Sequence, residues 1–139
     1  MGALTRELRL QSTGNVDMVD LTNEVRQFVQ ESGFKEGLVT VFVPGSTASV
    51  ITMEFEPGLK RDLKEFLEQV LPLGRDYFHN ETWHDDNGHS HMRSMLFGPS
   101  VSVPFSGGEP LLGTWQQVVV VDFDVRQRSR RVIIQVLGE

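Results

Sequence analysis

The sequence predicts an α+β fold in which an antiparallel β-sheet packs against about three helices, within a single domain that spans residues 1–139. Two observations lead to this prediction. Residues 114–123 and 131–137 are rich in valine and isoleucine, whose branched side chains favour strands. Apolar residues recur at helical spacing in residues 17–33 and 57–70, and neither repeats nor low-complexity linkers divide the chain.

The first elements are a strand and a helix. Residues 5–11 alternate between two faces, one of which carries Leu8 and Leu10, and this period of two predicts a strand. A helix is expected next, because Asp17 can act as its N-cap, apolar residues follow near helical spacing and Gly33 can end it.

Two strands and a second helix follow. Residues 38–43 form a continuous apolar run that Pro44 and Gly45 end, and residues 48–55 carry a second strand pattern across a short connection. The simplest topology pairs these two strands. A Pro-Gly pair then opens a helix over residues 57–70, which has one apolar stripe and alternating acids and bases on its other side.

A short helix and three strands complete the chain. Apolar side chains at positions 92, 95 and 96 have helical spacing before a Gly-Pro stop, which predicts a helix that begins near His91. Residues 101–105, 114–123 and 131–137 have strand patterns. The turn-like stretches between these strands favour an antiparallel meander.

Composition argues against several classes of protein. Thirteen Lys plus Arg against nineteen Asp plus Glu give a net charge of −6, so nucleic acid is not expected as a partner, because binding a phosphate backbone needs a basic face. The chain has no cysteine, which rules out a disulfide framework and a thiolate zinc site. No stretch approaches the ~20 apolar residues of a membrane span, so a cytoplasmic protein without a membrane partner is expected.

All four histidines lie between residues 79 and 91, and they are the main chemical clue. Neutral imidazole is the commonest nitrogen ligand of zinc-like metals, and three imidazoles with an open fourth position form one known catalytic site. We therefore predict His79, His89 and His91 as ligands of a divalent, zinc-like metal. In an extended segment His89 and His91 would share a face, whereas in a helix they would point nearly opposite ways. A set of polar surface-loop residues is the alternative.

A turn of small residues is the first candidate anion site. Ser46 and Thr47 supply hydroxyls and backbone N–H groups that can hold an anion between two strands. The turn has neither the lysine nor the glycine spacing of a P-loop, and a plain strand connection is the alternative.

Four arginines between residues 126 and 131 form the second candidate anion site, just before the last strand. Arg128 and Arg130 are the members that we assign to a ligand, because the guanidinium fork matches a phosphate group with two hydrogen bonds. A solvated hairpin tip is the alternative. The two interpretations differ in whether the arginines face the histidines.

A longer series of motifs runs in order along the chain. It comprises Ser46-Thr47-Ala48, Glu54, Asp62, Tyr77-x-His79, Asn87-Gly88-His89-x-His91, Leu96-x-Gly98-Pro99-Ser100, Leu112-Gly113-Thr114-Trp115-Gln116, Asp124, Arg128, Arg130 and Gln135-x-x-Gly138. In this order the motifs resemble the YjbQ family, also labelled secondary thiamine-phosphate synthase. The resemblance covers the chain from the first strand to the last residues. Its most specific parts are the Gly-Thr-Trp-Gln run and the spacing from the histidines to Gly-Pro-Ser.

The resemblance implies a compact α+β subunit that assembles as a homotrimer, with shared polar residues near the subunit contacts. It also implies a low thiamine-phosphate synthase activity, which couples a pyrimidine pyrophosphate to a thiazole phosphate and releases pyrophosphate. The sequence departs from the family at Gly45, because many relatives have Pro-His-Thr-Thr-Ala where this chain has Pro-Gly-Ser-Thr-Ala. Any metal must then rely on the three histidines above.

Together these residues lead to a mechanistic hypothesis. A divalent metal on the three histidines polarises a phosphoryl oxygen or a water, while Arg128 and Arg130 stabilise a phosphate or pyrophosphate leaving group. Glu54 is the candidate general base. The hydroxyl groups assigned to the anion are those of Ser46, Thr47 and Ser100.

The aromatic contact and the function itself leave alternatives open. Trp115 can stack on a heteroaromatic ring that Gln116 orients, or it can lie in the core or at a trimer contact. We expect a metal-dependent enzyme of the secondary thiamine-phosphate synthase type that acts on a phosphorylated heterocycle or related small anion. The alternative is a noncatalytic homotrimer that binds a metal or a metabolite.

Overall fold

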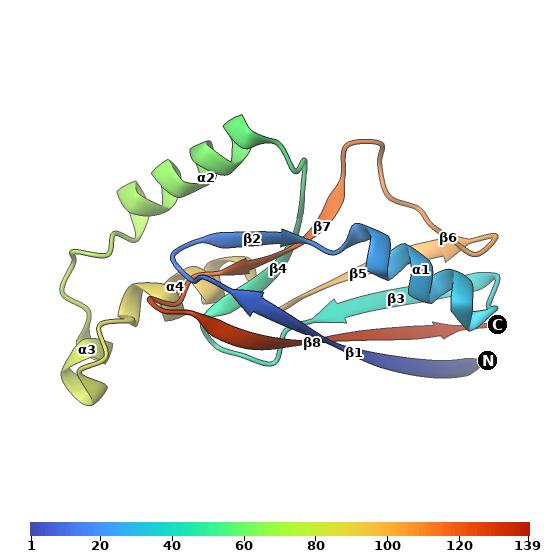
Figure 1. Ribbon diagram of the computed structural model, residues 1–139, viewed down its shortest axis with the longest axis horizontal. Helices are drawn as coiled ribbons and strands as arrows, with labels where there is room; N and C mark the ends of the chain where they lie inside the picture. The colour runs from blue at the N-terminus through green and yellow to red at the C-terminus, as the bar shows by residue number, and fades with distance from the viewer.

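Two antiparallel sheets and four helices build the protein, whose computed structural model describes residues 1–139 (Figure 1). The strands are β1 (Gly2–Ser12), β2 (Asp17–Asp20), β3 (Glu36–Phe42), β4 (Ala48–Met53), β5 (Ser100–Ser106), β6 (Glu109–Pro110), β7 (Gln117–Asp122) and β8 (Arg128–Gly138). The helices are α1 (Thr22–Ser32), α2 (Pro57–Val70), α3 (Phe78–Trp83) and α4 (Gly88–Phe97). The larger sheet has the strand order β1-β8-β3-β5-β6, and the smaller sheet has the order β2-β7-β4.

The elements form three layers. One face of the larger sheet packs on α1 and on the smaller sheet, and a cluster of 16 buried hydrophobic residues fills the space between them. On β8, Val132, Ile134 and Val136 point into this core while the residues between them point outward, as expected of a sheet with one buried face. The second face of the smaller sheet packs on α2 and α4 through Leu67 and Phe97.

The outer face of the larger sheet keeps apolar side chains in contact with solvent. Leu38 and Phe42 on β3 and Leu137 on β8 are 39% to 46% exposed, and the register places Leu38 opposite Leu137. Both α1 and the smaller sheet lie on the opposite face. The subunit therefore presents exposed apolar side chains, next to polar residues such as Thr40 and Gln135, on a sheet face that no element of its own chain covers.

Much of the predicted pattern is confirmed. The α+β class with antiparallel strands is correct, the strand over residues 5–11 lies within β1, and the helix over residues 57–70 is α2. The short helix expected near His91 is α4, which begins three residues earlier at Gly88. The short helix α3 is an addition to the predicted set. No helix is both long and apolar enough to span a membrane.

The predicted cap at Asp17 is wrong. Asp17 begins strand β2, which pairs with β7, and α1 starts only at Thr22. At the start of α1 the carboxylate of Asp20, and not that of Asp17, accepts hydrogen bonds from the amide of Thr22 at 2.9 Å and from its hydroxyl at 2.6 Å. Residues 17–20 therefore form a strand because they pair with β7, although the apolar residues from position 19 onward have helical spacing.

The predicted strand pairings are also wrong. Strand β3 lies between β8 and β5 in the larger sheet, whereas β4 pairs with β7 in the smaller one. The last three long strands are not a meander, because β5 and β8 both flank β3 while β7 belongs to the other sheet. The physical reason is burial. Val118 and Val120 of β7 enter one core while Val119 and Val121 enter the other, so β7 needs cover on both faces.

Candidate functional site

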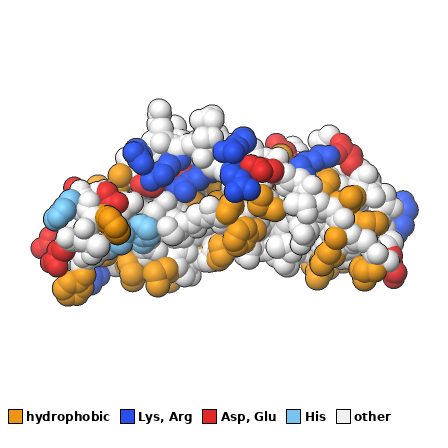
Figure 2. All heavy atoms as spheres, turned by 90° about the horizontal axis from the view of Figure 1, so that it is seen from below, with side chains coloured by type: hydrophobic (Ala, Val, Ile, Leu, Met, Phe, Trp, Pro, Cys, Tyr) orange, Lys and Arg blue, Asp and Glu red, His pale blue; other side chains and the backbone are white.

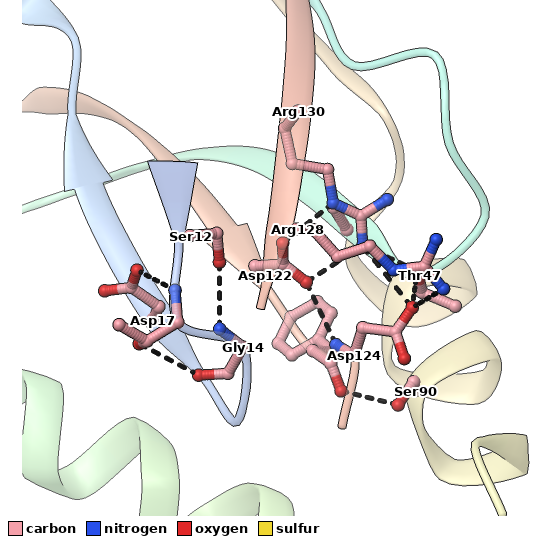
Figure 3. Close-up of polar contacts among 12 residues, drawn as sticks. Ser12, Gly14, Asp17, Thr47, Ser90, Asp122, Asp124, Arg128 and Arg130 are labelled. Atoms are coloured by element: carbon pink, nitrogen blue, oxygen red, sulfur yellow. Dashed lines mark hydrogen bonds and ion pairs between the residues drawn. The ribbon is translucent and has the colours of Figure 1, made fainter. Parts of the chain in front are cut away.

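The connection from β7 to β8 crosses from the smaller sheet to the larger one and brings two acids next to two arginines (Figure 3). At its centre Arg130 donates from Nε to Oδ2 of Asp122 at 2.7 Å and from Nη2 to Oδ1 of the same carboxylate at 2.9 Å. Arg130 is 9% exposed and Asp122 is 1% exposed. This bidentate pair fixes the plane of the guanidinium group.

Thr47 and Asp124 extend this network. The Thr47 hydroxyl accepts from Nη2 of Arg130 at 2.6 Å and donates to Oδ2 of Asp124 at 3.0 Å, and Nη2 of Arg128 lies 2.6 Å from the same oxygen (Figure 3). Burial alone would raise the pKa of Asp124. Hydrogen bonds from the Val125 amide and the Thr47 hydroxyl, with the charges of both arginines, outweigh burial and lower this pKa. Asp124 therefore stays ionised and holds both arginines in place.

One edge of Arg130 is left for a ligand. Its Nε and Nη2 are bonded within the network, while Nη1 points toward Gly45. A Cβ atom at Gly45 would lie 3.0 Å from Nη1, which is closer than an unstrained contact. The absence of a side chain at Gly45 therefore leaves Nη1 accessible.

Helices α3 and α4 place His79 beside His91, with ring centroids 4.3 Å apart and ring planes at 38°. The close approach of α3 and α4 depends on Gly88, because a Cβ atom there would lie 2.5 Å from the Cβ atom of Tyr77. The Gly88 amide also donates to the side-chain oxygen of Asn80 at 2.9 Å. Burial, and then the neighbouring His79, lower the pKa of His91. The neutral form of His91 is favoured as a result, and this form can accept a proton.

An open cavity of about 490 Å³ joins the arginines to the histidines, and we call it the arginine–histidine cavity. Its walls are Pro44, Gly45, Ser46, Thr47, His79, Trp83, Asp85, Asn87, His91, Arg128 and Arg130. Strand β8 begins at Arg128, three residues before its predicted start at residue 131. Arg128 and Arg130 lie on the same face of the strand as the buried Val132 and Val136. Both arginines therefore line the same cavity as His79 and His91, and the assignment of an anion to them stays a prediction.

His89 does not reach this cavity. His89 and His91 both belong to helix α4. Because they are two positions apart along the helix, their side chains point nearly opposite ways. His89 is 3% exposed and lines a separate cavity with Lys64 and Arg93, where burial, and then the charge of Arg93, lower its pKa. The expected three-histidine metal set is thus not assembled within the chain, and no group of three or more His, Cys, Asp or Glu residues is arranged to hold a metal ion.

A family model described as UPF0047 protein YjbQ-like matches residues 6–139. The chain belongs to the YjbQ family. A UPF0047 protein of Archaeoglobus fulgidus is 37% identical over 131 residues, which cover 94% of this chain and 99% of that protein. A UPF0047 protein of Mycobacterium tuberculosis strain H37Rv is 42% identical over 117 residues, 83% of this chain and 84% of that protein.

Solved structures give the same result for the fold. A crystal structure from Sulfolobus solfataricus P2, described as a YbjQ-like protein of unknown function, has a TM-score of 0.94 at 30% identity and covers 99% of each chain. An uncharacterised YjbQ/UPF0047 protein from Clostridium acetobutylicum has a TM-score of 0.86 at 32% identity, with 95% of this chain and 99% of that one covered. The family resemblance seen in the sequence is confirmed, and the descriptions of these four proteins name no reaction.

Besides His89, four predicted site residues of this YjbQ chain lie outside the arginine–histidine cavity. Glu54 follows the far end of β4, roughly 24 Å along the strand from Thr47 at about 3.4 Å per residue. Gln116 lies at the same far end, where its amide donates to Thr52 Oγ1 at 3.3 Å, and its neighbour Trp115 is 71% exposed. Ser100 begins β5 opposite Phe42. Their assigned roles therefore have no structural support in this cavity.

Three cavity features were not predicted by sequence reasoning. Asp122, the partner of Arg130, is not part of the family pattern, although two acids at 122 and 124 followed by arginines at 128 and 130 are a usable signal for paired charges. Trp83 is 72% exposed on the cavity wall, and Asn87 is buried with its side-chain oxygen unpartnered. No sequence pattern marks Trp83, whereas Asn87 belongs to the motif shared with the family but was assigned no role.

Proposed function

We propose that this YjbQ-family protein binds a small phosphorylated or otherwise anionic metabolite in the arginine–histidine cavity. One observation carries the proposal. Arg128 and Arg130 from β8 line the same open cavity as His79 from α3 and His91 from α4, although these elements lie far apart in the sequence. Guanidinium and imidazole N–H groups are the donors that phosphate oxygens accept best.

The binding strength comes from directed donors more than from net charge. Arg130 is paired with Asp122 and Arg128 is paired with Asp124, so the four groups are formally neutral together. The carboxylates hold the guanidinium groups before a ligand arrives, which removes part of the entropic cost of binding. The Ser46 and Thr47 segment lies on the same wall and offers further polar groups.

A reaction at this site follows from the same groups. We propose a group transfer of the secondary thiamine-phosphate synthase type, in which Arg128 and Arg130 hold a departing phosphate or pyrophosphate. In this coupling the thiazole nitrogen bonds to the pyrimidine methylene carbon while the bond from that carbon to the pyrophosphate oxygen breaks. Neutral His91, which lies in the cavity where Glu54 does not, donates an N–H hydrogen bond to the departing pyrophosphate. Developing negative charge on the leaving group is thus met by donors already in position.

The residues present do not fit a complete zinc site within one chain. His79 and His91 offer two nitrogen ligands, and Nδ1 of His79 is buried without a hydrogen-bond partner, with Oδ1 of Asp85 3.8 Å away. Catalytic zinc sites use three protein ligands, and no three such groups are arranged to hold a metal ion here. The proposed chemistry is therefore independent of a metal. A zinc-like ion held by His79 and His91 remains a separate prediction.

We also propose that the subunits associate as a homotrimer through the outer face of the larger sheet. The supporting observation is the exposed apolar surface around Leu38, Phe42 and Leu137. Apolar side chains gathered on one sheet face are typical of protein contacts. A noncatalytic trimer that only binds a metabolite is the alternative function, since the cavity contains no nucleophilic cysteine or lysine.

Trp83 makes a direct binding test possible. In a Trp115→Phe background Trp83 is the only tryptophan, and it lies on the cavity wall. Titration with inorganic phosphate or pyrophosphate should change its fluorescence saturably, and Arg128→Met or His91→Ala should abolish the change. Arg126→Met is the matched control, because Arg126 is exposed in the connection between β7 and β8 and does not line the cavity.

Turnover then separates the two functions. Formation of thiamine phosphate from its pyrimidine pyrophosphate and thiazole phosphate precursors should be lost in His91→Ala and retained in Arg126→Met. Saturable binding with no turnover would favour the noncatalytic alternative. A wild-type protein that shows no saturable response to either anion would overturn the proposed site.

A further inference from the structure

We infer that the His79–His91 pair divides one ligand site into two compartments, so that the ligand is a phosphate monoester of an aromatic or otherwise flat apolar group. This inference rests on the proposed function, because it assigns the phosphate to the arginine–histidine cavity. The apolar group occupies a second cavity of about 390 Å³ on the other side of the two imidazoles, which we call the methionine cavity.

The two cavities share their central wall. His79 and His91 line both, while Arg128 and Arg130 line only the first, and Met92 and Met95 line only the second. A molecule that contacts the imidazoles therefore has Arg128 and Arg130 toward one end. Toward the other end it has Met92 and Met95, and Arg75 and Asp76 also line this second cavity. Figure 2 shows histidine, apolar and basic side chains close together at the end of the molecule where α3 lies.

The walls of the methionine cavity suit a flat ring. Tyr77 and Phe78 border it from the start of α3, and Met92 and Met95 border it from successive turns of α4. Methionine side chains adapt their shape and make favourable contacts between sulfur and aromatic rings. The cavity volume falls within the range of about 300 to 1,000 Å³ that is usual for small-molecule sites.

The exposed apolar side chains at the rim support the same assignment. Phe78 is 88% exposed and Met95 is 75% exposed, so neither has a packing role inside the subunit. Phe78 and Met95 lie beside the arginine–histidine cavity. We therefore assign the apolar part of the same ligand as the group that covers them. This assignment replaces Trp115, which lies outside both cavities, as the residue that contacts the ring.

Phenyl phosphate and inorganic phosphate test this inference as a pair of probes. Titration calorimetry on the wild-type protein should show phenyl phosphate binding roughly tenfold more tightly than inorganic phosphate, because only the former buries a ring. The double variant Phe78→Gln with Met95→Gln should lose this preference while its affinity for inorganic phosphate is unchanged. Both positions are exposed, so the variant keeps its fold. Trp115→Gln is the matched control and should keep the preference.

The outcomes distinguish the failure of this inference from the failure of the proposed function. If inorganic phosphate binds but the ring adds no affinity, or the preference survives the double substitution, the methionine cavity is not the ring site. If the double substitution changes the sedimentation coefficient and leaves the preference intact, a second copy of the chain covers this cavity and the inference is overturned. If neither probe binds, the proposed function itself is wrong.

Discussion

Arg130 on β8 and Asp122 on β7 form a buried bidentate pair that connects the two sheets, with N to O distances of 2.7 and 2.9 Å. Hydrogen bonding to Asp122 raises the pKa of Arg130, which opposes the effect of burial. The pair lies at the edge of the arginine–histidine cavity, so the same contact serves the fold and the site. This dual role gives the first prediction.

Loss of Arg130 should destabilise the protein strongly. Arg130→Met leaves the buried Asp122 carboxylate without its partner, and breaking a buried ion pair in this way costs about 3 kcal/mol or more of the free energy of unfolding. Urea unfolding followed by circular dichroism measures the change. Arg131→Met is the control, because Arg131 pairs with the exposed Glu7 and should cost far less. Equal losses in the two variants would contradict the assigned role of the pair.

Gly45 should control access to the free edge of Arg130. In Gly45→Ala the new methyl group lies 3.0 Å from Nη1, and phosphate affinity should fall roughly tenfold as one charge-assisted hydrogen bond of about 1.5 kcal/mol is lost. The Trp83 fluorescence titration measures this affinity. Gly74→Ala should behave like wild type, since a Cβ atom there meets nothing within 4 Å. Unchanged phosphate affinity in Gly45→Ala would remove Nη1 from the binding site.

Any zinc that the protein takes up should depend on two histidines. We expect metal analysis of tag-free protein to show less zinc in His79→Ala and His91→Ala, whose rings lie 4.3 Å apart, than in wild type. His89→Ala should retain its zinc, because His89 lines a different cavity. A zinc content that depends equally on all three histidines would restore the three-histidine site and require a rearranged α4.

Acid should destabilise the fold partly through His89. Burial and the charge of Arg93 lower its pKa below the ordinary 6.5, so between these two values the unfolded chain binds more protons than the folded one. The contribution is therefore present above about pH 6.5 and is lost as the pH falls through the lowered value. Urea unfolding between about pH 8 and 5 should show a shallower decline in His89→Phe than in wild type. Parallel curves would rule out this linkage.

The apolar sheet face should govern assembly. Sedimentation velocity is expected to show a trimer for wild type and a monomer for Leu38→Arg, because a charge would be placed among Leu38, Phe42 and Leu137. Leu111→Arg is the control, since Leu111 is 60% exposed in the connection between β6 and β7 and lies outside this face. A trimer that survives Leu38→Arg would place the subunit contact elsewhere.

The candidate site was only partly accessible from the sequence. The guanidinium groups of Arg128 and Arg130 and the hydroxyl of Thr47 were identified by their chemistry, and they do share a cavity with His79 and His91. Glu54 was misplaced, because its position depends on the direction in which β4 leaves the Thr47 turn. His89 was wrongly grouped with His79 and His91. Because α4 begins at Gly88, His89 is helical and its ring points nearly opposite to that of His91.

Local sequence patterns were enough to predict the α+β class, the extent of α2 and the burial pattern of the long strands, since periods of 2 and 3.6 residues are local properties of the chain. Which strands are neighbours and which polar groups meet depends on the packing of the whole chain. The chain crosses between sheets from Asp122 to Arg128, and this crossing follows from the need to cover both faces of β7. Burial on two sides is a property of the whole packed molecule, so no local pattern could reveal it.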